Sequence, residues 1–350
     1  MDSAVQQSPS RPRAPRPLPL FLELVRLVSR DRPELAAEAL KGLHRYEQAD
    51  RASQPRQRPI IAQAGPASLR DCGGSGRPVV LVPSLINPPE ILDLDREVSL
   101  ADALVGDGRA VLLFDWGPAA ERRDLNVADH VEQLLVPLLA DLAGKASVVG
   151  YCLGGTMAIA AAQLVPVSSV ATVAAPWYFS AYPESARKQL ASLWSSAEAT
   201  AAQLGALPME VLQGAFWSLD PERTVAKFAR LAALEPGSDE ERRFLTLEDW
   251  ANQGEPLPAS AAQELIQGFF AADLPGSGLW QVAGKAMTDR LPCPALHVSA
   301  GRDLIVPAGS APAGQRRELA AGHVGMVVGS ARGQLHALLN DFLAACGEHR

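Results

Sequence analysis

A cysteine stands at the centre of a glycine-rich motif, residues 150–155, whose sequence is Gly-Tyr-Cys-Leu-Gly-Gly. An apolar run that is typical of a buried strand precedes the motif, and an alanine-rich segment that is typical of a helix follows it. A G-x-nucleophile-x-G sequence between a strand and a helix is typical of a nucleophile elbow, here with Cys152 in place of the more common serine. The alternative is a buried structural cysteine in a glycine-rich turn.

Steric crowding explains why the motif contains glycines. So tight a turn strains the backbone of the nucleophile, and a Cβ at Gly150 or Gly154 would clash with the neighbouring strand and helix. The N-terminus of the following helix lies beneath the sulfur of Cys152, where its dipole favours the thiolate. The sequence therefore predicts an elbow built from Gly150, Cys152 and Gly154.

A cysteine nucleophile needs a base, and the base needs an acid to orient it. At this kind of elbow the order along the chain is nucleophile, acid, histidine. Asp303 follows the apolar run 295–298, and His323 lies between two glycines in a loop before the last predicted helix. The sequence therefore predicts that Cys152, Asp303 and His323 act together. The alternatives are an aspartate in a surface turn and a structural loop histidine.

Acyl transfer also needs hydrogen-bond donors for the negative charge that develops on the substrate oxygen. The backbone N–H of Leu153, directly after the nucleophile, is one candidate. The loop after the apolar run 79–82 should supply the other, and we predict Ile86. Asp115 and Trp116 end another predicted strand, and their better interpretation is a structural hydrogen bond that fixes the following loop.

The other histidines and cysteines occupy positions that favour structural roles. The chain has no CxxC pair, no histidine pair at zinc spacing, no P-loop and no G-x-G-x-x-G after a strand. We therefore expect no metal site and no bound cofactor. The residues set aside in this way are His44, His130, His297, His336, His349, Cys72, Cys293 and Cys346.

Short apolar runs alternate with helical segments over much of the chain. This alternation predicts an α/β fold with a mostly parallel central sheet and helices on both faces. Between residues 175 and 294 the pattern becomes helical and rich in large aromatics, over a length too great for one crossover. These aromatics are more often core than lining of an acyl channel. The predicted strands are 79–82, 110–114, 146–149, 170–174 and 295–298.

The pattern also suggests domain boundaries. The proline- and arginine-rich residues 1–17 should be a disordered tail, and residues 18–58 an N-terminal helical segment with a linker. The core of the fold then takes residues 59–175 and 294–350, and residues 176–293 form a helical cap insertion. The apolar stretch near residue 20 is interrupted by charges and too short to span a bilayer, and we expect no transmembrane segment.

Composition excludes some functions. The chain has 350 residues, 47% of them hydrophobic, and can bury a large core. Its 32 basic and 39 acidic residues give a net charge of -7, which disfavours nucleic-acid binding. Four dispersed cysteines do not make a disulfide framework, and a reducing cytoplasm fits best.

Four parts of the chain resemble the polyhydroxyalkanoate synthases of the α/β-hydrolase superfamily, and in particular the short catalytic subunit of the two-component type. The resemblance extends over residues 60–345 and is strongest in the predicted sheet. The segments that carry it are 82–87 (Val-Pro-Ser-Leu-Ile-Asn) with 91–94 (Ile-Leu-Asp-Leu), 115–117 (Asp-Trp-Gly), 150–156 (Gly-Tyr-Cys-Leu-Gly-Gly-Thr), and 303–307 (Asp-Leu-Ile-Val-Pro) with 322–326 (Gly-His-Val-Gly-Met).

The resemblance implies an acyltransferase that moves a 3-hydroxyacyl group from a CoA thioester, through a thioester on Cys152, to the hydroxyl end of a growing polyester. It implies that His323 is the base and that Asp303 helps to activate the 3-hydroxyl of the incoming unit. The family usually has a histidine directly after this aspartate, whereas this chain has Leu304.

The resemblance also implies partners: a hydroxyacyl-CoA substrate, a polyester chain or granule surface, and a homodimer or a second synthase subunit. The expected location is the cytoplasm, with association to granules. One alternative is an esterase or thioesterase of the same fold that uses the same cysteine. Another is a catalytically silent subunit that binds a granule surface or a partner.

Overall fold

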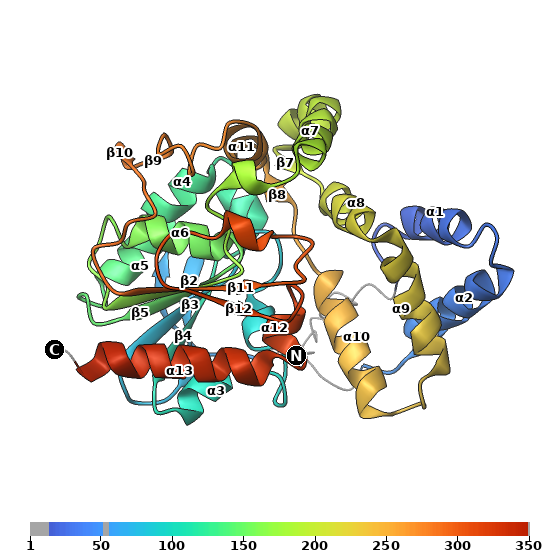
Figure 1. Ribbon diagram of the computed structural model, residues 1–350, viewed down its shortest axis with the longest axis horizontal. Helices are drawn as coiled ribbons and strands as arrows, with labels where there is room; N and C mark the ends of the chain where they lie inside the picture. The colour runs from blue at the N-terminus through green and yellow to red at the C-terminus, as the bar shows by residue number, and fades with distance from the viewer. Residues whose placement is uncertain (1–13, 52–55, 349–350) are drawn as a thin grey trace, which may run out of the picture. The chain divides into compact units, whose positions relative to one another are not determined.

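Figure 1 shows the computed structural model of the chain, which describes residues 14–51 and 56–348. Its central sheet contains β1 (Ile60–Ala64), β2 (Ala67–Gly73), β3 (Pro78–Val82), β4 (Ala110–Asp115), β5 (Ser147–Tyr151), β6 (Ser169–Val173), β11 (Ala295–Ala300) and β12 (Arg316–Leu319). The strand order is β1-β2-β4-β3-β5-β6-β11-β12. The pairs β1–β2 and β2–β4 are antiparallel, and the other pairs of this sheet are parallel. The predicted mostly parallel sheet is therefore confirmed.

The central strands are buried on both faces. Every residue of β5 and β6 is buried, as expected of apolar runs at the centre of a parallel sheet. The two edges differ: β1 exposes Ile60 and Ile61, and β12 exposes Arg316, Arg317 and Glu318. The C-terminal ends of the parallel strands meet at one edge of the sheet, where a fold of this kind collects its functional residues.

Helices cover both faces of the sheet (Figure 1). On one face lie α3 (Leu100–Gly106) and α13 (Arg332–Glu348), and on the other lies α6 (Leu153–Ala161). A continuous helical segment, α4 (Val127–Asp129), η3 (His130–Leu135) and α5 (Val136–Ala140), also packs beside α6. Short helical turns complete this part: η1 (Pro89–Leu92), η2 (Ala119–Arg122), η6 (Ala308–Ser310) and α12 (Gly325–Val328).

A long insertion separates β6 from β11. It is mostly helical, as predicted, but it also contains two short antiparallel ribbons. Its elements are η4 (Phe179–Ala181), α7 (Glu184–Leu204), β7 (Ala206–Leu207), α8 (Met209–Leu219), α9 (Pro221–Ala233), α10 (Asp239–Ala251), β8 (Leu257–Pro258), α11 (Ala259–Gln263), η5 (Glu264–Ala271), β9 (Gln281–Val282) and β10 (Lys285–Ala286).

The chain divides into two compact units at residues other than the predicted boundaries. One unit takes the described part of Met1–Gln54 together with Glu210–Gly254, and the other takes the described part of Pro55–Met209 together with Glu255–Arg350. The middle of the insertion therefore groups with the N-terminal helices and not with the rest of the predicted cap. Of the predicted tail, residues 1–13 lie outside the described part of the chain.

The smaller unit has its own aromatic core. Its N-terminal helices are α1 (Leu18–Val28) and α2 (Pro33–Gln48), and they pack with α9. The ring centroids of Phe21 and Phe228 lie 4.6 Å apart, and those of Tyr46 and Phe228 5.8 Å apart. A Cβ at Gly42 would lie 1.8 Å from the carbonyl oxygen of Phe228, so the glycine is what lets α2 and α9 approach so closely.

Among the described residues, no helix is both long enough and apolar enough to cross a membrane.

Candidate active site

Cys152 lies at the turn between β5 and α6, with φ of 55° and ψ of -131°. An L-residue rarely adopts these angles, which marks the strained backbone of a sharp turn. Backbone atoms crowd both flanking glycines: a Cβ at Gly150 would lie 2.4 Å from Gly155 Cα, and one at Gly154 would lie 2.3 Å from the oxygen of Pro83. The thiol is therefore held at the N-terminus of α6 by a turn that other residues at these two positions would disrupt.

Asp303 and His323 meet at the C-terminal edge of the sheet. Asp303 follows β11, His323 follows β12, and Nδ1 of His323 lies 2.7 Å from Oδ2 of Asp303. The other carboxylate oxygen, Oδ1, accepts the backbone N–H groups of Ile305 at 2.8 Å and Val306 at 2.9 Å. The Asp303 side chain has no exposed surface, so these bonds fix the orientation of the imidazole.

The sulfur of Cys152 lies near enough to the imidazole of His323 to affect its protonation. Because Nδ1 faces Asp303, Nε2 is the nitrogen left for the sulfur. Burial alone would lower the pKa of His323, but the negative charge of Cys152 and the hydrogen bond with Asp303 raise it to about 10. A proton that leaves the thiol is therefore held firmly on the imidazole, as a base that activates a cysteine requires.

Two tyrosines near the site have no signal in the sequence that marks them as functional. The Tyr151 hydroxyl lies 3.4 Å from the carbonyl oxygen of His323, and the two rings are 5.1 Å apart. Tyr182 is buried and stacks on Phe179. Burial and the negative charges of Cys152 and Asp303 raise the pKa of both tyrosines well above the ordinary value. Both phenols therefore stay neutral and can donate hydrogen bonds.

The predicted oxyanion donors differ in their surroundings. Leu153 begins α6, so its N–H lies at the helix N-terminus beside the sulfur. The loop after β3 lies against α6, because Gly154 approaches the backbone of Val82 and Pro83. The N–H of Ile86, however, donates to Oγ of Ser84 at 3.3 Å. Ile86 must lose this long hydrogen bond before it can serve an oxyanion, and its role stays a prediction.

Asp115 and Trp116, which we interpreted as structural, form hydrogen bonds that fix the neighbouring loops. The indole N–H of Trp116 donates to the carbonyl oxygen of Pro83 at 3.1 Å, and Oδ1 of Asp115 accepts the N–H of Gly117 at 2.9 Å. Burial lowers the pKa of both His130 and His297 to about 4, so neither is suited to hold a proton at neutral pH. Among the described residues, no group of three His, Cys, Asp or Glu side chains could hold a metal ion.

Curated relatives of the chain share one name. The "Poly(3-hydroxyalkanoate) polymerase subunit PhaC" of Haloferax mediterranei is 28% identical over 291 residues, which cover 77% of this chain and 59% of the relative. The PhaC subunit of Allochromatium vinosum is 26% identical over 243 residues, which cover 66% of this chain and 67% of the relative. The chain is similar to PhaC. The PhaC subunit of Haloarcula marismortui is also 26% identical, and the match covers 57% of its length. The chain therefore spans less than two thirds of the length of the Haloferax and Haloarcula subunits.

No protein-family model matches this PhaC-like chain. Solved structures nevertheless show its fold. A thermophilic esterase from Thermogutta terrifontis matches with a TM-score of 0.52 at 16% identity, over 83% of this chain and 99% of the esterase. An epoxide hydrolase of the α/β-hydrolase superfamily from metagenomes of hot environments matches with a TM-score of 0.50 at 18% identity, over 82% and 99%. The chain has the α/β-hydrolase fold, and the resemblance to polyhydroxyalkanoate synthases is confirmed.

Proposed function

We propose that the chain is an acyltransferase that moves a 3-hydroxyacyl group from CoA to the hydroxyl end of a polyester chain. The observation that carries the proposal is the elbow cysteine, with the His323–Asp303 pair hydrogen-bonded beside it, in a PhaC-like chain. The same proposal includes three kinds of partner: a hydroxyacyl-CoA substrate, a polyester chain or granule surface, and a homodimer partner or a second synthase subunit.

In the first half-reaction, His323 takes the proton of Cys152 and the sulfur attacks the carbonyl carbon of the thioester. The tetrahedral oxyanion is stabilised by backbone N–H donors, for which Leu153 and Ile86 are our candidates. When the carbon–sulfur bond to CoA breaks, the leaving thiolate takes the proton from His323. The products are free CoA and an acyl thioester on Cys152.

In the second half-reaction, His323 takes the proton of the hydroxyl group that ends the polyester, and the oxygen attacks the Cys152 thioester. The new ester forms as the cysteine sulfur leaves, and the proton returns to it. A cysteine suits this step because its thioester keeps the acyl group activated for transfer to an alcohol.

The surroundings of Asp303 favour a role through His323 over direct contact with substrate. One of its oxygens accepts two backbone N–H groups and the other accepts His323, and the side chain is fully buried. We therefore propose that Asp303 orients His323 and stabilises the imidazolium, and that the hydroxyl group of the incoming unit is activated by His323 itself.

The test is incubation of the purified chain with 3-hydroxybutyryl-CoA, alone and with a candidate second subunit, while free CoA thiol and insoluble polymer are measured together. We expect thiol release with polymer from the wild type and from Cys293→Ala. Cys152→Ala should lose about 10⁴-fold or more of the activity, and Cys152→Ser should retain slow hydrolysis. Thiol release that yields free hydroxy acid alone would instead identify a thioesterase.

A further inference from the structure

The aromatic ring of Tyr151 lies against the imidazole of His323. Tyr151 is the last residue of β5, directly before Cys152, and only 3% of it is exposed. The centroids of the two rings are 5.1 Å apart and their planes are inclined by 37°. Two rings that lie edge to edge in one plane need a larger separation, so the phenol ring covers part of one face of the imidazole.

The phenol of Tyr151 also reaches the backbone of the same histidine. Its hydroxyl donates to the carbonyl oxygen of His323 at 3.4 Å, which is a long and therefore weak hydrogen bond. His323 lies in a loop with Gly322 before it and Gly325 after it, and glycines restrict the backbone least. Tyr151 therefore holds the loop residue at two points, of which the ring contact is the stronger.

The ring contact restrains a motion of the imidazole that Asp303 leaves free. The hydrogen bond between Nδ1 of His323 and Oδ2 of Asp303, at 2.7 Å, fixes one edge of the imidazole. A ring that is held by one hydrogen bond can still rotate about that bond. Because Tyr151 packs on a face of the imidazole and not on the edge held by Asp303, the two contacts together fix where Nε2 points.

The ring of Tyr151 also affects the charge of His323. The face of an aromatic ring carries partial negative charge and attracts a cation within about 6 Å of its centroid. In the described part of the chain, the titratable groups that face His323 are Cys152 and Asp303, and Tyr182 of the insertion lies in the field of both. Burial and the same two charges keep Tyr151 a neutral phenol, so it acts through its ring electrons.

We propose that Tyr151 is a positioning residue whose ring holds the imidazole of His323 towards Cys152 and stabilises the imidazolium that forms when the thiol loses its proton. The inference rests on the proposed function, because it concerns the same cysteine and the same base. It gives the residue between Gly150 and Cys152 in the elbow a role of its own. If the ring only filled space, an apolar side chain of similar size would replace it.

The test is the pH dependence of Cys152 alkylation by iodoacetamide in the full chain, followed by mass spectrometry of the Cys152 peptide. The thiolate is the form that reacts, so the rate reports proton exchange with His323. No acyl substrate is needed, so failure here is distinct from failure of acyl transfer. Tyr151→Leu should move the midpoint of the profile upwards by about one pH unit, and Tyr151→Phe, which keeps the ring, by less than about 0.3 unit.

A variant that keeps the shape of the ring separates the electrostatic role from packing. Replacement of Tyr151 by pentafluorophenylalanine preserves an aromatic ring of nearly the same size, but the fluorines reverse the charge on its face. We expect this protein to fold and its midpoint to rise by at least as much as that of Tyr151→Leu. Urea unfolding of each protein checks that the fold is kept.

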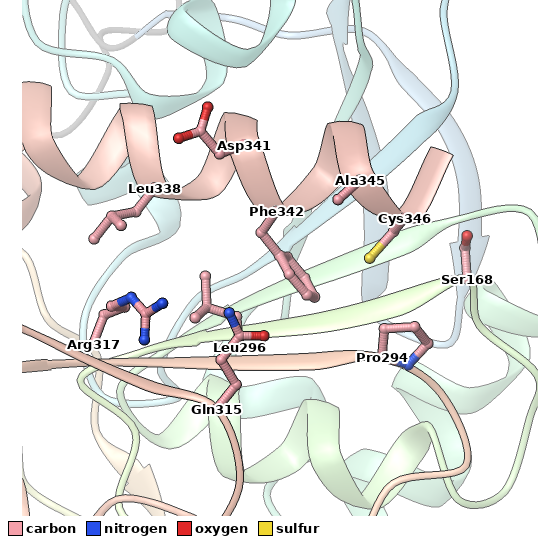
Figure 2. Close-up of a pocket in the computed structure, with 10 residues that line it drawn as sticks. All are labelled: Ser168, Pro294, Leu296, Gln315, Arg317, Leu338, Asp341, Phe342, Ala345 and Cys346. Atoms are coloured by element: carbon pink, nitrogen blue, oxygen red, sulfur yellow. The ribbon is translucent and has the colours of Figure 1, made fainter. Parts of the chain in front are cut away.

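Two controls accompany the measurement. Tyr178→Leu removes a tyrosine whose hydroxyl donates to Asp289, and it should leave the profile of Cys152 unchanged. Cys346 lies in a groove beside Ser168 and Pro294, which precede β6 and β11 and so lie at the edge of the sheet opposite to the site (Figure 2). Alkylation of Cys346 should follow one profile in all the proteins.

Two results would overturn the proposal. One is a fluorinated protein whose Cys152 profile coincides with that of the wild type. The other is a Tyr151→Phe shift as large as that of Tyr151→Leu, because the ring would then not be the group that matters.

Discussion

At the scale of single residues, the hydrogen bonds of Asp303 fix the orientation of His323, the base in the proposed mechanism. Its two oxygens are shared between backbone N–H groups and His323, and none of its surface reaches solvent. This arrangement keeps the proton of His323 on Nδ1 and leaves Nε2 to exchange a proton with sulfur or with a hydroxyl group. In the proposed mechanism, one histidine can then serve both half-reactions.

The Asp303→Asn variant should show whether activity depends on the way the Asp303 carboxylate orients His323 or only on the shape of the side chain at position 303. The amide fills the same space but can donate to Nδ1, which favours the tautomer that cannot accept a proton at Nε2, and kcat should fall about 10³- to 10⁴-fold. Because Asp303 raises the pKa of His323, the variant should also shift the histidine titration to lower pH. The check is the pH profile of CoA release. Asp124→Asn, at an exposed position, is the control. If the activity of Asp303→Asn stayed within tenfold of the activity of the wild type or of this control, the proposed role of Asp303 would be contradicted.

The raised pKa of His323 also predicts how stability depends on pH. In an unfolded chain histidine titrates near pH 6.5, whereas in the folded chain the pKa of His323 is about 10. The folded state therefore binds this proton more tightly. The resulting stabilisation is fully present below about pH 6.5 and is lost as the pH rises through about 10.

Urea unfolding of the wild type and of His323→Gln at pH 6, 8 and 10 measures this effect. The difference in unfolding free energy between the two proteins should be largest at pH 6 and shrink steadily towards pH 10. A difference that stays constant, or grows with pH, would mean that His323 does not hold an extra proton in the folded state.

At the same scale, the prediction of Asp303 and His323 came from sequence order, because the fold fixes the order of the nucleophile, the acid and the histidine along the chain. The structure brings these two residues within hydrogen-bonding distance. Tyr182 could not be selected in this way. Its place beside the site results from packing against Phe179 and Phe270 in the insertion, and no local pattern reports such contacts.

At the scale of elements, the turn between β5 and α6 depends on its glycines. A Cβ at Gly154 would meet the backbone oxygens of Val82 and Pro83 at 2.4 and 2.3 Å, and neither can move without shifting β3. Gly154→Ala should therefore destabilise the fold by about 2 kcal/mol or more and displace Cys152. Chemical denaturation together with the rate of CoA release measures both effects.

Gly333→Ala is the matched control for this change. Gly333 lies in α13, and a Cβ there would meet no atom within 4 Å. Since alanine favours a helix more than glycine, this variant should gain up to about 1 kcal/mol. A Gly154→Ala protein as stable and as active as the control would show that the elbow tolerates a side chain.

Some strands of the sheet could be predicted from the sequence and others could not, and the reason is physical. The five apolar runs became β3, β4, β5, β6 and β11, because strands buried on both faces must be apolar throughout. The edge strand β12 was not predicted. Three of its four residues are exposed and charged, so it has neither an apolar run nor an alternating pattern. Backbone pairing with β11 holds it in the sheet.

At the scale of the whole molecule, the two compact units show what local patterns leave out. The sequence indicated a helical insertion, yet α9 packs with α1 and α2 instead of forming one cap with the rest of the insertion. Contacts between segments almost 200 residues apart, such as that between Tyr46 and Phe228, create this unit. Side-chain periodicity within each helix does not specify which partner the apolar face meets.

The core of the smaller unit should respond strongly to truncation. Phe228 is buried and contacts the rings of Phe21, Tyr46 and Phe244, so Phe228→Ala should cost about 3–5 kcal/mol of unfolding free energy. Leu40→Ala, at a half-exposed position of α2, should cost about 0.5 kcal/mol or less. Urea denaturation followed by tryptophan fluorescence measures both. Equal losses for the two variants would contradict this core.

The central claim is that Cys152 carries the acyl group, and mass spectrometry tests it most directly. The full chain is mixed with 3-hydroxybutyryl-CoA, quenched in acid within milliseconds to seconds, digested, and searched for a 3-hydroxybutyryl adduct. We expect the adduct on the peptide that contains Cys152, much reduced in His323→Gln and absent in Cys152→Ala. Turnover with no adduct on this peptide, or an adduct that persists on another residue in Cys152→Ala, would contradict it.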